Sequence, residues 1–137
     1  MVRIGVLVSG GGTNLQQLID AQAREELGGG RIVTVISSRP EVFALERAKN
    51  AGIEAVTLSR KDYPDVEALI VALKEREVDL VVLSGFLTIT SDSFVQAFPN
   101  RIMNVHPALL PAFGGKGYYG LHVHEAVLSR GCKLTGA

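Results

Sequence analysis

Hydrophobic residues occur along the chain in two alternating arrangements: short unbroken runs, and stretches in which they recur every three or four positions. The runs predict β-strands and the spaced positions predict helices. Strands are expected at 3–8, 31–37, 54–58, 79–83 and 101–105, with the start of another at Leu134. Helices are expected from Leu15 to the glycine run 28–30, over 41–51, around 66–73, between Ser91 or Ser93 and Pro99, and over 122–130.

This alternation indicates the fold class. Strands that are hydrophobic throughout are buried on both faces, which is typical of a parallel sheet with helices on both sides. Right-handed crossovers would place the strands in the order 3-2-1-4-5. We therefore predict a doubly wound, Rossmann-like α/β fold with a mainly parallel sheet. Ligands in such sheets bind beyond the carboxyl ends of the strands where the order reverses, which selects 9–14, 84–90 and 104–107.

Composition and charge narrow the range of partners. Fourteen Lys and Arg balance fourteen Asp and Glu among 137 residues, so no net charge would attract nucleic acid or an anionic membrane surface. The hydrophobic runs are far shorter than the roughly 20 residues of a membrane helix, and shorter than the core of a signal peptide. A soluble cytoplasmic protein is expected. Cys132 is the one cysteine, which excludes an intrachain disulfide.

A glycine loop follows the first predicted strand. Gly10, Gly11 and Gly12 allow a sharp turn and a close approach of the backbone to a ligand. The free N–H groups of the helix that follows carry partial positive charge, so an anion such as phosphate would fit there. Thr13 and Asn14 could add side-chain donors. The alternative is a tight turn without a ligand.

The loop matches two common nucleotide motifs only in part. Leu15 occupies the third glycine position of the dinucleotide motif, and the lysine of Walker-type ATPases is missing. The segment 37–39 (Ser-Ser-Arg) could still bind a 2′-phosphate after the second strand. An NADP-binding oxidoreductase domain therefore stays open as an alternative, as does a nucleotide-binding module without catalytic activity.

Asn104 and His106 stand two positions apart at the end of the strand predicted at 101–105, so their side chains would share one face. Asparagine offers a neutral amide donor, and histidine can donate or accept a proton near neutral pH. Together they suit the stabilisation of a developing oxyanion. Hydrogen bonds from both side chains to loop backbone are the alternative, and the pattern alone leaves both open.

Three segments, in this order along the chain, resemble the folate-dependent formyltransferase family. They are Gly10-Gly11-Gly12-Thr13-Asn14-Leu15, Ser84-Gly85-Phe86-Leu87 and Asn104-Val105-His106-Pro107-Ala108-Leu109-Leu110-Pro111. The third segment is shared by the wider family, which includes methionyl-tRNA formyltransferases and formyltetrahydrofolate deformylases. The first resembles the phosphoribosylglycinamide formyltransferase branch, in which this loop binds the substrate phosphate.

The resemblance implies a reaction. A formyl group would pass from the cosubstrate 10-formyltetrahydrofolate to the amine of glycinamide ribonucleotide by direct acyl transfer, in de novo purine biosynthesis. Asn104 and His106 would be the catalytic residues, stabilising the oxygen of the tetrahedral intermediate. Another formyltransferase or a deformylase of the family is the alternative. The partners would be these small molecules, with a homodimer as the expected assembly and no nucleic acid or membrane.

The resemblance also implies two sets of binding residues. The ribonucleotide would contact Gly12, Thr13, Asn14, Leu87, Val105 and Pro107. The folate would contact Leu83, Thr88, Ile89, Thr90, Val95 and Ile102. Thr88 departs from the arginine commonly found there, and folate affinity would be lower if that arginine steers the glutamate tail. The bond between Leu110 and Pro111 is expected to be cis.

Two further expectations concern metals and chain length. His106, His122 and His124 are the three histidines, but an i, i+2 pair on a helix does not face one point and the family is not metal-dependent, so no metal is expected. Family members are longer, and their catalytic aspartate falls beyond the last residue of this chain. The resemblance therefore implies a single formyltransferase domain over 1–137 that is incomplete at its C-terminus. A piece of this length would be expected to keep the phosphate loop but to lose most formyl transfer.

Overall fold

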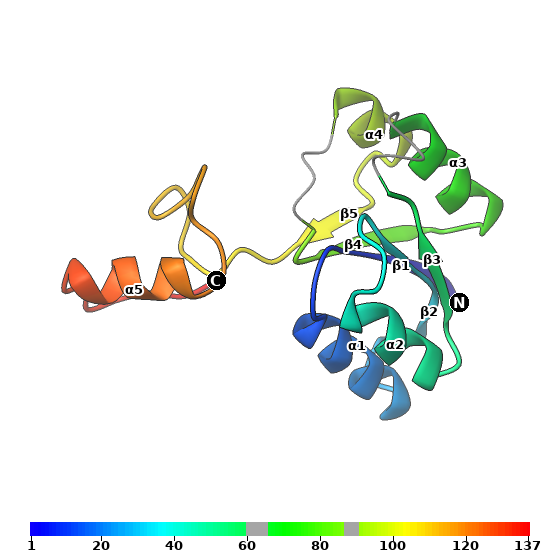
Figure 1. Cartoon of the computed structure of the whole chain (residues 1–137), viewed down its shortest axis with the longest axis horizontal. Coiled ribbons are helices and arrows are strands. Elements are labelled where there is room, and N and C mark those ends of the chain that lie inside the picture. Colours follow the sequence, from blue (N-terminus) through cyan, green and yellow to red (C-terminus); the bar gives the residue numbers. More distant parts are fainter. Residues whose placement is uncertain (60–65, 87–90) are drawn as a thin grey trace. The chain divides into compact units, whose positions relative to one another are not determined.

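The computed structural model describes residues 1–59, 66–86 and 91–137, which form two compact units, Met1–Met103 and Asn104–Ala137 (Figure 1). The strands are β1 (Val2–Val8), β2 (Gly30–Ser37), β3 (Glu54–Thr57), β4 (Leu80–Ser84) and β5 (Ile102–Asn104). The helices are α1 (Thr13–Ala23), α2 (Phe43–Asn50), α3 (Val66–Glu75), α4 (Asp92–Ala97) and α5 (Leu121–Ser129).

The five strands form one sheet in the order β3-β2-β1-β4-β5, which confirms the predicted order. β1 lies between β2 and β4 and pairs with both in parallel. At its carboxyl end, Val8 is opposite Ser37 on one side and Ser84 on the other. The strand order therefore reverses at the end of β1, where the glycine loop begins.

Two hydrophobic clusters cover the two faces of the sheet. Val6 and Val8 of β1 pack with α1 and α2, whereas Leu7 between them packs with α3 and α4. This alternation follows from the two-residue period of a strand. Figure 1 shows α1 and α2 on one side of the sheet and α3 and α4 on the other. The predicted doubly wound α/β fold, with helices on both faces, is confirmed.

Several predicted boundaries are wrong, and backbone conformation gives the reason for two of them. The first helix ends at Ala23 rather than at the glycine run, because Glu25 adopts a φ of 59°. The second begins at Phe43 rather than at residue 41, because Glu41 has a φ of 53°. Neither left-handed conformation is compatible with a continuing right-handed helix.

Other differences concern the strands and the last helix. β3 ends one residue before its predicted end, β4 is shifted by one residue, and α5 begins and ends one residue earlier than predicted. The strand expected to begin at Leu134 is absent, since residues 134–137 are irregular and the Leu134 side chain is 81% exposed. A hydrophobic run becomes a strand only when its backbone pairs with a neighbour, and this segment pairs with none of the strands in the described part of the chain.

The second unit contains α5 and a long loop. Val123 and Val127 of α5 and Ala108 of the loop are buried. The bond between Leu110 and Pro111 is cis, as the resemblance implied. Among the residues that the structure describes, no helix is long and apolar enough to span a membrane.

Candidate active site

The glycine loop connects β1 to α1, and its last glycine requires a residue without a side chain. Gly12 is the N-cap of α1 and has a φ of 73°. A Cβ atom added there would lie 2.7 Å from Cβ of Ala44 and 3.0 Å from its Cα. Both the left-handed conformation and the contact with α2 therefore favour glycine at this position.

The three carbonyl oxygens of the glycine loop all accept hydrogen bonds. Gly10 O accepts from the backbone N–H of Ala44 at 3.3 Å, and Gly12 O accepts from that of Gln16 at 2.9 Å. Gly11 O accepts from Nε of Arg47 at 2.9 Å. In a trans peptide the carbonyl and the next N–H point in opposite directions. The N–H groups that follow these carbonyls therefore point away from those donors. None of them has an acceptor among the described residues, so they could bind an anion.

A pocket of about 180 Å³ lies beside the loop. It is lined by residues 10–14 of the loop together with Ser84 and Gly85 at the end of β4. At about 30 Å³ per water molecule, this volume is sufficient for a phosphate group. The structure thus brings together two of the three segments that the strand-reversal rule selected, including the predicted residues Gly12, Thr13 and Asn14.

Ser84 also lines this pocket, although its side chain is not among the residues predicted for the site. Leu80 and Val82 pack with α1 and α2, so the period of the strand turns Ser84 toward the same face. The residue is 5% exposed, and its Oγ has no hydrogen-bond partner among the described residues. The available signal was a hydroxyl at the carboxyl end of an otherwise hydrophobic strand.

We expect Ser84→Ala to leave the melting temperature unchanged or to raise it, because it removes a buried polar atom that lacks a partner. Rotation about χ1 would allow the hydroxyl to donate to a bound phosphate, so affinity for inorganic phosphate should fall by about tenfold. Calorimetry and thermal unfolding would measure the two effects. Ser9→Ala is a matched control, since Ser9 is equally buried but its Oγ is 2.8 Å from Oγ of Ser38. A marked loss of stability in Ser84→Ala would contradict the prediction.

The predicted catalytic pair lies at the start of the second unit. Asn104 is the last residue of β5 and is exposed, and Val105 is 66% exposed. His106 and Pro107 are half-buried and follow the strand. The prediction of a strand over 101–105 that ends next to His106 is therefore wrong by one residue at each end. Asn104 lies on β5, whereas His106 lies beyond it, so strand periodicity does not orient the histidine.

His106 has one unusual feature. Its Nδ1 atom is buried and has no hydrogen-bond partner among the described residues. The partner of one ring nitrogen fixes the tautomer and orientation of an imidazole. No described residue fixes the tautomer of His106 through Nδ1, so a donor or an acceptor from elsewhere could bind this atom.

The predicted folate-binding residues are described only in part. Leu83 and Ile102 are half-buried and pack against the cluster of α3 and α4, and Val95 on α4 is 51% exposed. Leu87, expected at the ribonucleotide site, and Thr88, Ile89 and Thr90 lie outside the described residues. The pteridine pocket stays a prediction.

The hydroxyl groups of segment 37–39, where a 2′-phosphate could bind, already make hydrogen bonds within the protein. Ser37 Oγ donates to the carbonyl oxygen of Arg39 at 2.7 Å, and Ser38 Oγ lies 2.8 Å from Oγ of Ser9. These hydroxyls hold the connection after β2 against the end of β1. This arrangement weighs against an NADP site.

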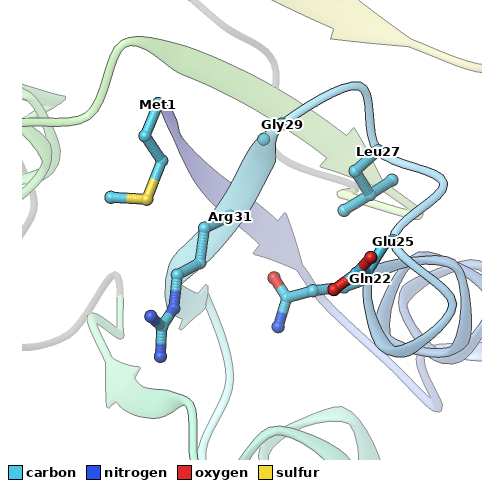
Figure 2. Close-up of a pocket in the computed structure, with 7 residues that line it drawn as sticks. Met1, Gln22, Glu25, Leu27, Gly29 and Arg31 are labelled. Atoms are coloured by element: carbon cyan, nitrogen blue, oxygen red, sulfur yellow. The ribbon is translucent and has the colours of Figure 1, made fainter.

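Two other features of the described residues do not form part of the site. No group of three or more His, Cys, Asp and Glu side chains in the described ranges could hold a metal ion. A hollow of about 580 Å³ lies at the amino ends of β1 and β2, where Met1, Gln22 and Arg31 are among its lining residues (Figure 2). Gln22 Oε1 already accepts from the N–H of Ile32 at 2.6 Å. This hollow lies at the amino ends of the strands, whereas the glycine loop lies at their carboxyl ends, so the hollow does not contribute to the site.

Comparison with known proteins identifies the family. The profile of the Formyl transferase family matches residues 2–137. The chain is 40% identical to the phosphoribosylglycinamide formyltransferase of Escherichia coli (strain K12), and 37% identical to the chloroplastic enzyme of that name from Vigna unguiculata. Each match covers 98% of the chain. The solved structure of glycinamide ribonucleotide transformylase 1 from Symbiobacterium toebii superposes with a TM-score of 0.88 at 41% identity and covers 99% of the chain.

The chain spans only part of each of these relatives. It covers 63% of the Escherichia coli protein, 44% of the Vigna unguiculata protein and 63% of the Symbiobacterium toebii chain. The family profile matches every residue of this chain except Met1. The chain therefore belongs to the formyl transferase family.

Proposed function

We propose that the protein transfers a formyl group from 10-formyltetrahydrofolate to the primary amine of glycinamide ribonucleotide, a step of de novo purine biosynthesis. The observation that carries the proposal is the glycine-loop pocket, whose backbone N–H groups are suited to a phosphate monoester. Relatives named phosphoribosylglycinamide formyltransferase support the same substrate.

In this proposal the phosphate of the ribonucleotide binds at Gly12, Thr13 and Asn14. The N-terminus of α1 contributes the partial positive charge, and the Thr13 and Asn14 side chains add donors. Fixing the phosphate at one end of the substrate would orient the amine at the other end. Leu87, Val105 and Pro107 are proposed to line the rest of the ribonucleotide site.

The chemistry proposed is direct acyl transfer. Attack of the amine on the formyl carbon places negative charge on the formyl oxygen and positive charge on the attacking nitrogen. The attacking nitrogen must then lose one proton while the departing folate nitrogen gains one. The Asn104 amide can donate a hydrogen bond to that oxygen, and protonated His106 can stabilise it and supply the proton. A partner at His106 Nδ1 would fix the orientation of the ring. The folate is proposed to bind at Leu83, Thr88, Ile89, Thr90, Val95 and Ile102.

An assay of the purified full-length protein, of which this chain is a part, with both substrates tests the function. The expected result is release of tetrahydrofolate in equal amount to formylated ribonucleotide, and no release without the ribonucleotide. Release without it would instead indicate a deformylase, and a requirement for charged initiator tRNA would indicate a tRNA formyltransferase. If none of the three acceptors supports release, the proposal is wrong.

We further propose a cytoplasmic location and a homodimer, with small molecules as the ligands. The balanced charge supports the expectation that neither nucleic acid nor a membrane surface is a partner. Light scattering after size-exclusion chromatography would determine the oligomeric state.

A further inference from the structure

Arg47 on α2 contacts the glycine loop although the two lie 36 positions apart in the sequence. Its Nε donates to the carbonyl oxygen of Gly11 at 2.9 Å, and its Nη1 donates to Oε1 of Gln16 at 2.9 Å. The guanidinium carbon is 4.6 Å from the centre of the Phe43 ring. A planar guanidinium with two hydrogen bonds and a stacked ring has little freedom to move.

The second partner of Arg47 is itself held in place. Gln16 Nε2 donates to Oδ1 of Asp20 one turn further along α1, at 2.9 Å. The amide of Gln16 therefore presents its oxygen to Arg47 and its nitrogen to Asp20. Phe43, Gln16 and Asp20 together fix the direction from which Arg47 reaches the loop.

We propose that Arg47 is a positioning residue for the phosphate loop. By holding the carbonyl of Gly11 on the α2 side, it turns the N–H of Gly12 to the opposite side. The hydrogen bond from Ala44 to Gly10 acts in the same way on the N–H of Gly11. The pocket is also lined by Ser84, the last residue of β4, and by Gly85, which follows it, so both N–H groups would be directed toward an anion bound there.

Arg47 also contributes charge. It carries a full positive charge at the outer side of a loop whose inner side faces the phosphate. A cation at this position favours a bound dianion without contacting it. The inference rests on the proposed function for the identity of the anion, which is the phosphate of the ribonucleotide.

The test compares Arg47→Met and Arg47→Lys with Arg24→Met. Methionine keeps much of the stem but removes the donors and the charge, and lysine restores the charge without the planar fork. Arg24 is 56% exposed and pairs with Glu26, so its replacement removes one surface arginine away from the loop. The readouts are steady-state kinetics with both substrates, and titration of ¹⁵N-labelled protein with inorganic phosphate, followed at the amides of Gly11 and Gly12.

Arg47→Met should raise KM for the ribonucleotide by about tenfold or more, the effect of losing one charge-assisted hydrogen bond, with KM for the folate unchanged. Phosphate should shift the two amides in the parent protein and in Arg24→Met, and much more weakly in Arg47→Met. Arg47→Lys should restore part of the affinity. If Arg47→Met is poorly folded, Phe43→Leu, which removes only the stacked ring, should show a smaller change in the same direction.

The outcomes separate the two proposals. Formyl transfer with equal ribonucleotide KM in Arg47→Met and Arg24→Met would overturn the role of Arg47 and leave the proposed function in place. Phosphate binding that depends on Arg47, in a protein without formyl transfer, would support the role of Arg47 and overturn the proposed function. A change in KM for both substrates equally would indicate a structural effect and would also overturn the positioning role.

Discussion

His106→Ala is expected to lower the turnover of formyl transfer by about 10²–10³-fold, the usual effect of losing one donor to a developing oxyanion. KM for the ribonucleotide should change little, because the phosphate is held by the glycine loop rather than by the imidazole. The expected loss is larger if the same ring also supplies the proton to the leaving nitrogen. Steady-state kinetics with both substrates saturating would measure it.

The control for this prediction is His124→Ala. His124 is exposed on α5, and its replacement removes an imidazole from the same unit without touching the predicted catalytic pair. It should leave turnover unchanged. Asn104→Ala should resemble His106→Ala if both groups act on one oxygen, and the double variant should lose less than the product of the two single effects. Equal turnover in His106→Ala and His124→Ala would rule out the catalytic role.

The sheet and its order could be predicted because each strand is a distinct hydrophobic run and crossovers have a fixed hand. The end of α1 and the start of α2 could not be predicted. Glu25 and Glu41 adopt left-handed conformations there, and glutamate is not a residue type from which such a conformation is expected. The irregular segment at Leu134 has the composition of a strand, and only pairing decides whether such a segment becomes one.

Candidate site residues could be chosen where the chemistry lies in local motifs. Three consecutive glycines after a strand predict an anion-binding loop, and a pocket lies beside Gly12, Thr13 and Asn14. Anion binding there stays a prediction. The contact of Arg47 with the loop depends on how α2 packs, which no local pattern encodes. The same holds for Ser84, because its burial beside the loop without a partner among the described residues follows from packing and not from its neighbours in sequence.

Gly12→Ala is expected to lower both the stability of the protein and its affinity for phosphate. Alanine at a φ of 73° costs about 1–2 kcal/mol in backbone strain. The added methyl group would also meet the backbone of Ala44 at 3.0 Å, so the loop or α2 must shift. Together these effects should destabilise the fold by about 2–4 kcal/mol, a loss that thermal unfolding would detect as a fall of several degrees or more.

Gly52→Ala separates the strain from the contact. Gly52 has a similar φ of 69°, but an added Cβ would have no atom within 4 Å, and the residue is not part of the glycine-loop pocket. This variant should show the strain alone, about 1–2 kcal/mol, with phosphate affinity unchanged. Gly12→Ala should be less stable than Gly52→Ala and should bind inorganic phosphate at least tenfold more weakly, because a shift of the loop misdirects its N–H groups. If the two variants were equally stable and bound phosphate equally well, close packing of the loop against α2 would not be what shapes the phosphate site.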